Sequence, residues 1–289
     1  MTHHQQHQHQ GRAVVRERVV VGVDGSLVSV RALDRAADEA ARRGCPLRVV
    51  HAVPDRDEAA PVLASSASRV ADRRPALAVE TVATESGAVR ALADASGSAA
   101  LTVVGTRGLG GLGGLLFGSV SLRVAAHTHG PLLVVRGDHA DGSGGDVLLH
   151  LPDDADAAVA DYAFEEARRR GARLRVLHTP AHRHVLPELP SLVPATSPGQ
   201  ERLARRERAD EAVPRFGLAT LRDLHPQVEI VADTVRTAPA HALLEATRDA
   251  AVVVIGVRRT DGRPGPRPGA VGHTLLHRSH CPVVVVPAG

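Results

Sequence analysis

The chain has 289 residues and a formal net charge of +3, with 35 arginines, no lysine and 32 acidic residues. This length suits two ordinary domains that each bury a core, and no apolar run reaches the roughly 18 residues that span a bilayer, which excludes a membrane-spanning protein. Arginines interleaved with acids and only 1% aromatic residues argue against a nucleic-acid partner, which would need a basic stripe and stacking side chains.

The first residues, MTHHQQHQHQ, are polar and lack the apolar core of a signal peptide. We predict a disordered, His/Gln-rich tail over residues 1–17 and no metal site, since histidines on a flexible tail have no fixed geometry. Cys45 and Cys281 give no disulfide framework, which indicates a reduced, cytoplasmic compartment.

Short apolar runs and helical patterns then alternate through a predicted first domain, residues 18–137. Ser26 is the predicted start of the first helix, and Gly44 its end. The expected strands are 19–23, 47–53, 77–83, 101–105 and 131–135, and the expected helices follow Ser26 and cover 57–74, 87–97 and 119–129. Continuous apolar strands that alternate with helices predict an α/β fold, a doubly wound parallel sheet covered on both faces.

The same plan occurs twice. RRGCPLRVVHAV (42–53) returns as RRGARLRVLHTP (169–180), and GPLLVV (130–135) returns as CPVVVV (281–286). A repeat of this length indicates two tandem domains that pack together. We predict a linker at 138–145 and a second domain at 146–289, with an insertion near 181–226.

The loop at 105–120 holds seven glycines and follows the fourth strand. A P-loop is excluded because it requires lysine. Gly108, Gly110 and Gly113 match GxGxxG, but a dinucleotide fingerprint belongs after the first strand. A third interpretation uses Gly118 and the residues after it, whose amides at a helix N-terminus suit a phosphate, while Asp24 at the end of the first strand accepts hydrogen bonds from a ribose or an adenine.

VVVGVDGS (19–26), LRVVHAV (47–53), VVGTRG (103–108), the Gly-2x-Gly-9x-Gly-Ser spacing and the closing GPLLVV together resemble a tandem universal stress protein. The resemblance implies two five-stranded sheets of order 3-2-1-4-5 and binding of ATP or a related adenine nucleotide, with Mg²⁺ as its companion ion. The implied binding residues are Gly22, Val23, Asp24 and Ala52 near the adenosine, and Gly105, Thr106, Arg107, Gly108, Gly118, Ser119 and Val120 around the ribose and phosphates. It also implies pairing of the domains through their last strands within one chain, and a homodimer of chains.

The second domain departs from this pattern. Aligning the RRG repeat puts Leu151 where Asp24 stands, and aligning the last strands puts Ala270 where Ser119 stands. Arg259 replaces Gly108, and three prolines in 260–268 remove backbone donors. We predict a degenerate partner domain; alternatively Arg258, Arg259, Arg263 and Arg267 bind a different anion.

The leading hypothesis is a nucleotide-binding sensor or regulator of the stress response, with at most slow ATP hydrolysis. The alternatives are a dimerisation or interaction module of the same fold without nucleotide, and an adenine-nucleotide hydrolase. On its own, the sequence Asp24-Gly25-Ser26 is typical of a turn followed by a helix cap. His51 and His178 occupy equivalent places in the two copies, which predicts a shared packing role.

Overall fold

A computed structural model describes residues 18–106, 119–136, 145–151, 157–178, 218–235, 238–259, 266–267 and 269–288. The predicted tail, the centre of the glycine loop, almost all of the predicted linker and much of the predicted insertion lie outside these residues. Within them, no helix is both long enough and apolar enough to cross a lipid bilayer.

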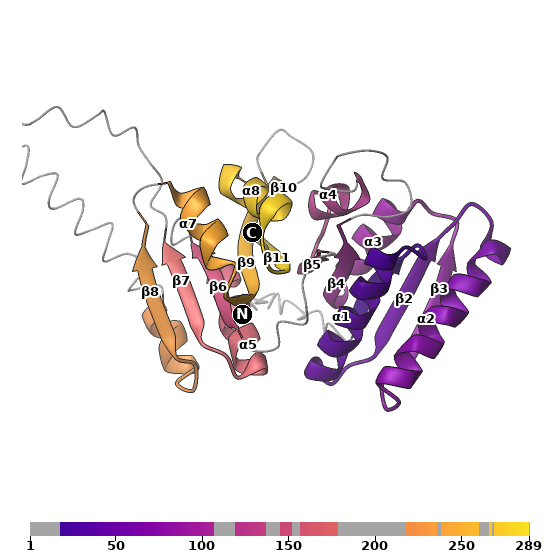
Figure 1. The fold of residues 1–289 in the computed structure, drawn as a ribbon, viewed down its shortest axis with the longest axis horizontal. Coiled ribbons are helices and arrows are strands. Elements are labelled where there is room, and N and C mark those ends of the chain that lie inside the picture. The colour runs from indigo at the N-terminus through magenta and orange to yellow at the C-terminus, as the bar shows by residue number, and fades with distance from the viewer. Residues whose placement is uncertain are drawn as a thin grey trace, which may run out of the picture.

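The first half follows the predicted alternation of strands and helices (Figure 1). Its elements are β1 (Arg18–Val23), α1 (Leu27–Arg43), β2 (Leu47–Ala52), the 3₁₀ helix η1 (Arg56–Ala59), α2 (Ala60–Arg73), β3 (Val79–Thr84), α3 (Ala88–Ser96), β4 (Ala99–Gly105), α4 (Ser119–Ala125) and β5 (Leu132–Val135). The predicted helix over 119–129 ends earlier, at Ala125, because a tight turn follows in which His127 N–H donates to the Val124 carbonyl.

The second half repeats this plan after the predicted joint. Its elements are β6 (Asp146–Leu151), α5 (Ala157–Arg170), β7 (Leu174–His178), a helical segment at 218–224, β8 (Ile230–Thr234), α7 (Pro239–Ala246), β9 (Ala250–Arg259), β10 (Pro266–Arg267), α8 (Ala270–Arg278) and β11 (Val283–Ala288). The short β10 pairs antiparallel with the end of β9.

All strands of the described residues belong to one 11-stranded sheet, whose main path runs β3-β2-β1-β4-β5-β11-β9-β6-β7-β8. Within each half the pairs are parallel and the order is 3-2-1-4-5, as predicted. The central strands even share an irregularity: the register shifts between Arg18 and Val19 in β1, and between Asp146 and Val147 in β6.

Helix α1 shows how local sequence sets these boundaries. The Ser26 hydroxyl accepts a hydrogen bond from the Ser29 amide at 3.2 Å and caps the first turn. At the other end Gly44 adopts a left-handed conformation, with φ of 63°, in which glycine carries no steric penalty. Both predicted boundaries of this helix are therefore confirmed.

Two apolar layers lie on opposite faces of the sheet, and each runs through both halves. One layer contains α1, α2 and α5 with alternate strand residues such as Val21 and Leu149. The other contains α3, α4, α7 and α8 with the intervening strand residues, such as Val20 and Leu148. Strands buried on both faces explain the near-continuous valine runs in the sequence.

The two halves meet through β5 and β11, which pair antiparallel with Val134 opposite Val283. This is the predicted pairing of the last strands within one chain. Beside it, α1 contacts α5 through buried charges: Arg43 donates to Glu166 at 2.6 Å, and Arg170 donates to Glu39. Because both ion pairs join equivalent positions of the repeat, they relate the halves by an approximate twofold axis.

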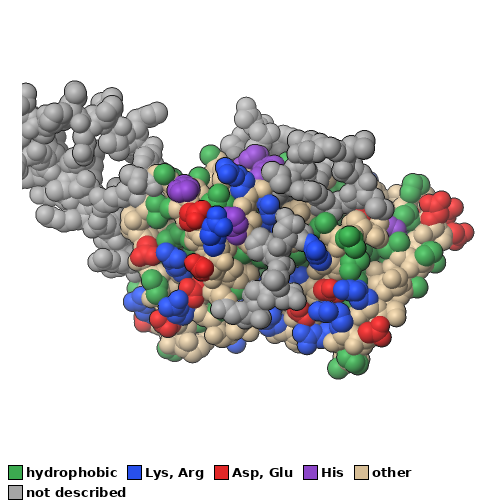
Figure 2. Space-filling view, in the orientation of Figure 1, with side chains coloured by type: hydrophobic (Ala, Val, Ile, Leu, Met, Phe, Trp, Pro, Cys, Tyr) green, Lys and Arg blue, Asp and Glu red, His purple; other side chains and the backbone are tan. Residues whose placement is uncertain are grey.

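The visible surface carries arginine and acidic side chains next to one another (Figure 2). Several form ion pairs at partly exposed positions, such as Arg48 with Glu80 at 2.9 Å and Arg69 with Asp34 at 2.7 Å. Exposed pairs of this kind stabilise a fold by only about 0–1 kcal/mol each, whereas removing one partner of a buried pair, such as those between α1 and α5, typically costs more.

Candidate functional site

Parallel pairing brings several predicted binding residues to one edge of the first-half sheet. The register of β1 with β2 pairs Val23 with His51, so Ala52 lies beside Asp24 at the ends of these strands. The register of β1 with β4 pairs Val21 with Val103, which places Gly105 beside Val23. Gly22, Val23, Asp24, Ala52 and Gly105 thus share the carboxyl edge, where ligands bind in doubly wound sheets.

Asp24 takes part in the turn that joins β1 to α1. Its Oδ1 accepts a hydrogen bond from the Ser26 amide at 3.1 Å, and Gly25 between them has a φ of +80°. The carboxylate is half-buried. This turn is the local role that the sequence alone suggests, and it also holds the carboxylate at the strand end.

Two predicted binding glycines stand at close packing contacts between the sheet and a helix. A Cβ atom on Gly22 would lie 2.7 Å from Leu92 Cδ1, and one on Gly105 would lie 2.8 Å from Val28 Cγ1 and 3.1 Å from the Val28 carbonyl oxygen. Both contacts are shorter than carbon atoms tolerate. Gly22 lets α3 approach the sheet, and Gly105 does the same for α1.

The start of α4 is anchored to the end of β4. The Ser121 hydroxyl donates to the Gly105 carbonyl at 2.5 Å, and the buried Thr106 donates its amide to the Val135 carbonyl at 2.9 Å. Ser119 is the first residue of α4, and Val120 is 38% exposed. The remaining predicted residues, Arg107, Gly108 and Gly118, lie outside the described residues.

A histidine secures the end of the central strand in each half. His51 Nδ1 lies 2.7 Å from the Val23 carbonyl oxygen, and His178 Nδ1 lies 3.0 Å from the Leu151 carbonyl oxygen. The shared role predicted for these histidines is confirmed. The same bonds, with the strand pairings, make Leu151 the counterpart of Val23.

That correspondence corrects the sequence alignment by one residue. Aligned on the repeat, Leu151 stands for Asp24. Because the sheet register makes Leu151 the counterpart of Val23, the residue that corresponds to Asp24 in the sequence is Pro152, which lies outside the described residues. The reason is a segment one residue shorter between the central strand and the glycine that ends the helix: Leu151 to Gly171, against Val23 to Gly44. A carboxylate is still absent from this position.

The corrected register also puts His150 at the place of Gly22, a difference that the alignment concealed. His150 is buried, and burial followed by the nearby His178 lowers the pKa of its imidazole to about 4. A neutral imidazole therefore occupies the strand position that the first half leaves without a side chain.

Other chemistry has little support in the described part of the chain. Burial raises the pKa of the Cys45 thiol, and it raises that of Cys281 to about 11, so neither is activated as a nucleophile. The described residues contain no group of three or more histidine, cysteine or acidic side chains placed to hold a metal ion.

These features define a class: a tandem of doubly wound α/β halves, joined through their last strands, with a turn-held carboxylate at the ligand edge of the first half. The sequence profile of the universal stress protein family matches residues 16–136 and again 147–287. The chain therefore belongs to the universal stress protein family.

Individual relatives agree over nearly the full length. A universal stress protein of Mycolicibacterium smegmatis is 31% identical over 292 residues, which covers 93% of this chain and 96% of the relative. One of Mycobacterium tuberculosis strain H37Rv is 31% identical over 294 residues, covering 92% and 96%. The crystal structure of a universal stress protein from Archaeoglobus fulgidus shares the fold with a TM-score of 0.63 at 19% identity, covering 94% and 98%.

Proposed function

We propose that the first half binds an adenine nucleotide, ATP in the first instance, and that the protein acts as a sensor or regulator in a stress response. The adenosine would lie near Gly22, Val23, Asp24 and Ala52. The ribose and phosphates would lie along Gly105, Thr106, Arg107, Gly108, Gly118, Ser119 and Val120. We further propose that the second half is a structural partner and that two chains associate as a homodimer.

The observation that carries this proposal is the position of Asp24. Asp24 directly follows Val23, the neighbour of Gly105, and lies beside Ala52 at this edge; it is half-buried, and its carboxylate accepts a hydrogen bond from the Ser26 amide. A fixed carboxylate there can accept hydrogen bonds from ribose hydroxyls or an adenine amino group without being ordered on binding.

The residues present fit the proposed ligand. Strand β4 ends at Gly105, and α4 begins at Ser119, tied back to Gly105 through the Ser121 hydroxyl. The first amides of a helix have no partners within the helix and favour an anion, as a phosphate requires. Mg²⁺ would accompany the nucleotide chiefly through its phosphate oxygens.

One observation favours the second candidate, an interaction module without nucleotide. Gly22 and Gly105 are each explained by contact with a helix, and Asp24 and Ser26 by the turn and cap of α1. Each of these residues has a local structural role even without a ligand, so binding itself is the quantity to measure.

The test is isothermal titration with ATP and Mg²⁺, together with analysis of nucleotide released from the purified protein on denaturation. We expect one equivalent per chain. Asp24→Asn keeps an oxygen acceptor for the Ser26 amide but removes the charge, so affinity should fall at least about tenfold while the free energy of unfolding changes little. Asp24→Ala should abolish binding and cost about 1 kcal/mol through loss of the turn.

The matched control is Asp72→Ala, an exposed carboxylate on α2 that should leave binding unchanged. Failure of the unmodified protein to bind or release nucleotide would support the module without nucleotide. Two equivalents per chain would show that the second half is a binding domain as well.

A further inference from the structure

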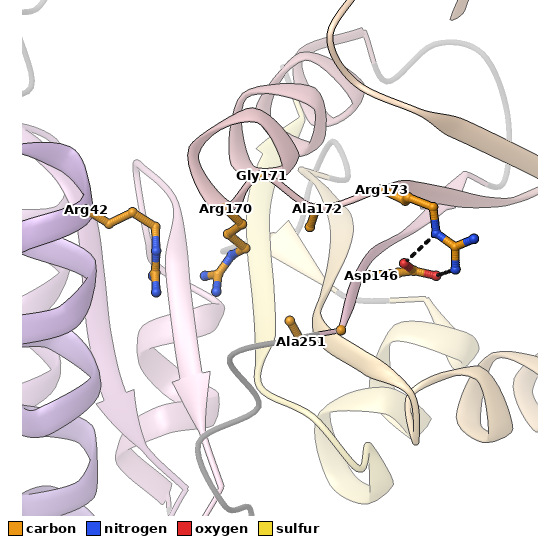
Figure 3. A pocket seen from close by; sticks show the side chains of 8 residues that line it. Arg42, Asp146, Arg170, Gly171, Ala172, Arg173 and Ala251 are labelled. Atoms are coloured by element: carbon orange, nitrogen blue, oxygen red, sulfur yellow. Dashed lines mark hydrogen bonds and ion pairs between the residues drawn. The ribbon is translucent and has the colours of Figure 1, made fainter.

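A second candidate site lies at the opposite edge of the sheet, where the two halves meet (Figure 3). It is a pocket of about 260 Å³ at the amino ends of β6, β7 and β9. Its charged lining consists of Arg42 from the last turn of α1, Arg170 from the end of α5, Arg173, and Asp146. Both halves therefore contribute to it.

Arg42 and Arg170 present their charges to one space, and Arg173 lines the pocket beside Asp146. Figure 3 shows the side chains of Arg42 and Arg170 approaching this space from α1 and α5, with Arg173 bound to Asp146 on the far side. The Arg173–Asp146 pair is bidentate, with both distances 3.0 Å. Three guanidinium groups against one carboxylate leave the lining with an excess of two positive charges.

The buried charges behind the pocket do not cancel this excess. Glu39 is paired with Arg35, Arg42, Arg43 and Arg170, and Glu166 with Arg43, Arg169 and Arg170. Arg169 is also paired with Glu165, but the other four arginines share two carboxylates among the described residues. The network is thus two negative charges short.

Arg35 shows the effect of this shortage. Burial and the nearby Arg170 lower the pKa of its guanidinium below the usual value, although Glu39 opposes the change. Its Nη2 atom is buried and has no hydrogen-bond partner among the described residues. Arg35 stands where the repeat has Tyr162, so the surplus charge belongs to one side of the twofold axis.

We propose that this pocket binds a phosphate-type oxyanion between Arg42, Arg170 and Arg173. Guanidinium groups recognise tetrahedral oxyanions through paired N–H donors, and a divalent anion would neutralise the charge that Glu39 and Glu166 leave uncompensated. Since Arg42 and Arg170 belong to different halves, the anion would bridge them and stabilise their contact. The site is separate from the proposed nucleotide edge and does not depend on it.

The test is titration of the full chain with inorganic phosphate at constant ionic strength, followed by calorimetry and by thermal unfolding. We expect saturable binding with a Kd of about 0.1–1 mM and a rise in Tm that chloride does not produce. Arg42→Gln and Arg173→Gln should each weaken binding about tenfold or more. Pyrophosphate and glycerol 3-phosphate, titrated in parallel, distinguish a free phosphate from the phosphate group of a larger molecule.

Two further variants separate binding from folding. Asp146→Asn removes the opposing carboxylate and should tighten phosphate binding several-fold, a direction that a merely structural role would not produce. Arg90→Gln, which removes an arginine on α3 whose side chain is 83% exposed, should have no effect. Absence of saturable heat up to about 10 mM phosphate, or binding that persists in the Arg42→Gln/Arg173→Gln double variant, overturns the proposal.

Discussion

The ends of the two central strands, β1 and β6, share a register and a histidine that binds the last carbonyl, yet they present different chemistry. β1 has Gly22 and is followed by a turn that fixes Asp24, whereas β6 has His150 at the glycine position and is followed in the sequence by Pro152. The difference shows that a doubly wound half can keep its sheet with different side chains at this edge. Variants can therefore test the packing of each half separately from the proposed binding.

The largest effect is expected where the halves share charges. Glu39→Ala removes the buried carboxylate that pairs with Arg35, Arg42, Arg43 and Arg170, so it should destabilise the protein by about 3–5 kcal/mol, measured by urea unfolding. Although burial raises the pKa of Glu39, Arg170, Arg43 and the other arginines outweigh it and lower that pKa to about 2. Unfolding should therefore become easier as the pH falls from 4.5 toward 2.

Glu166→Ala provides the comparison with Glu39→Ala. It should lower the free energy of unfolding by less, because Arg169 keeps its ion pair with Glu165. Glu80→Ala, at an exposed pair, should cost under about 1 kcal/mol. Equal losses for Glu39→Ala and Glu166→Ala would contradict the asymmetry argued from Arg35.

A smaller effect should distinguish the halves by pH. His150 is neutral in the folded state down to a pKa of about 4, whereas an unfolded histidine takes up a proton near 6.5. Above pH 6.5 the histidine is neutral in both states and does not affect the free energy of unfolding. As the pH drops toward 4, only the unfolded state takes up the proton, so the free energy of unfolding falls by up to about 3 kcal/mol. The first half has Gly22 at the equivalent position, which does not titrate, so it makes no matching contribution to the pH dependence of stability.

This pH dependence can be measured as the urea midpoint at pH 7.5 and pH 4.5. His150→Gln should reduce the difference between the two values, while the exposed His129→Gln should leave it unchanged. A difference as large in His150→Gln as in the unmodified protein would show that other groups cause the acid sensitivity.

The smallest effect concerns the cap of α1. Ser26→Ala removes the acceptor for the Ser29 amide and should cost about 1 kcal/mol in unfolding free energy. Ser26→Asp supplies another acceptor and should cost little. The exposed Ser98→Ala serves as the control, with a change expected within about 0.5 kcal/mol. If Ser26→Asp lowered the free energy of unfolding as much as Ser26→Ala, Ser26 would have a structural role beyond capping α1.

Much of the fold could be predicted because its signals are local. Valine-rich runs marked the buried strands, Ser26 and Gly44 marked the ends of α1, and the family resemblance supplied the strand order and the pairing of β5 with β11. In the candidate site, the motif identified Asp24 and Gly105, which the structure brings to one edge.

The missed features depend on geometry between distant segments. The packing need for Gly22 depends on how close Leu92 approaches, and the place of His150 on a register that a single deleted residue shifts. The pairing of Glu39 with Arg170 depends on the orientation of the halves. Glutamates near the end of arginine-rich helices gave no sign that they were buried, since such side chains are usually exposed.

The antiparallel contact of β5 with β11 joins two segments of a single polypeptide, so the paired surfaces are free to diverge. In an assembly of identical subunits every substitution appears twice across the axis, and an arginine near it would meet its own copy. Here Arg35 has Tyr162 as its counterpart, and the Tyr162 hydroxyl accepts a hydrogen bond from Arg43. Because the two halves are covalently linked but have separate sequences, the chain is equivalent to a heterodimer encoded in one gene. A substitution in one half is not repeated in the other.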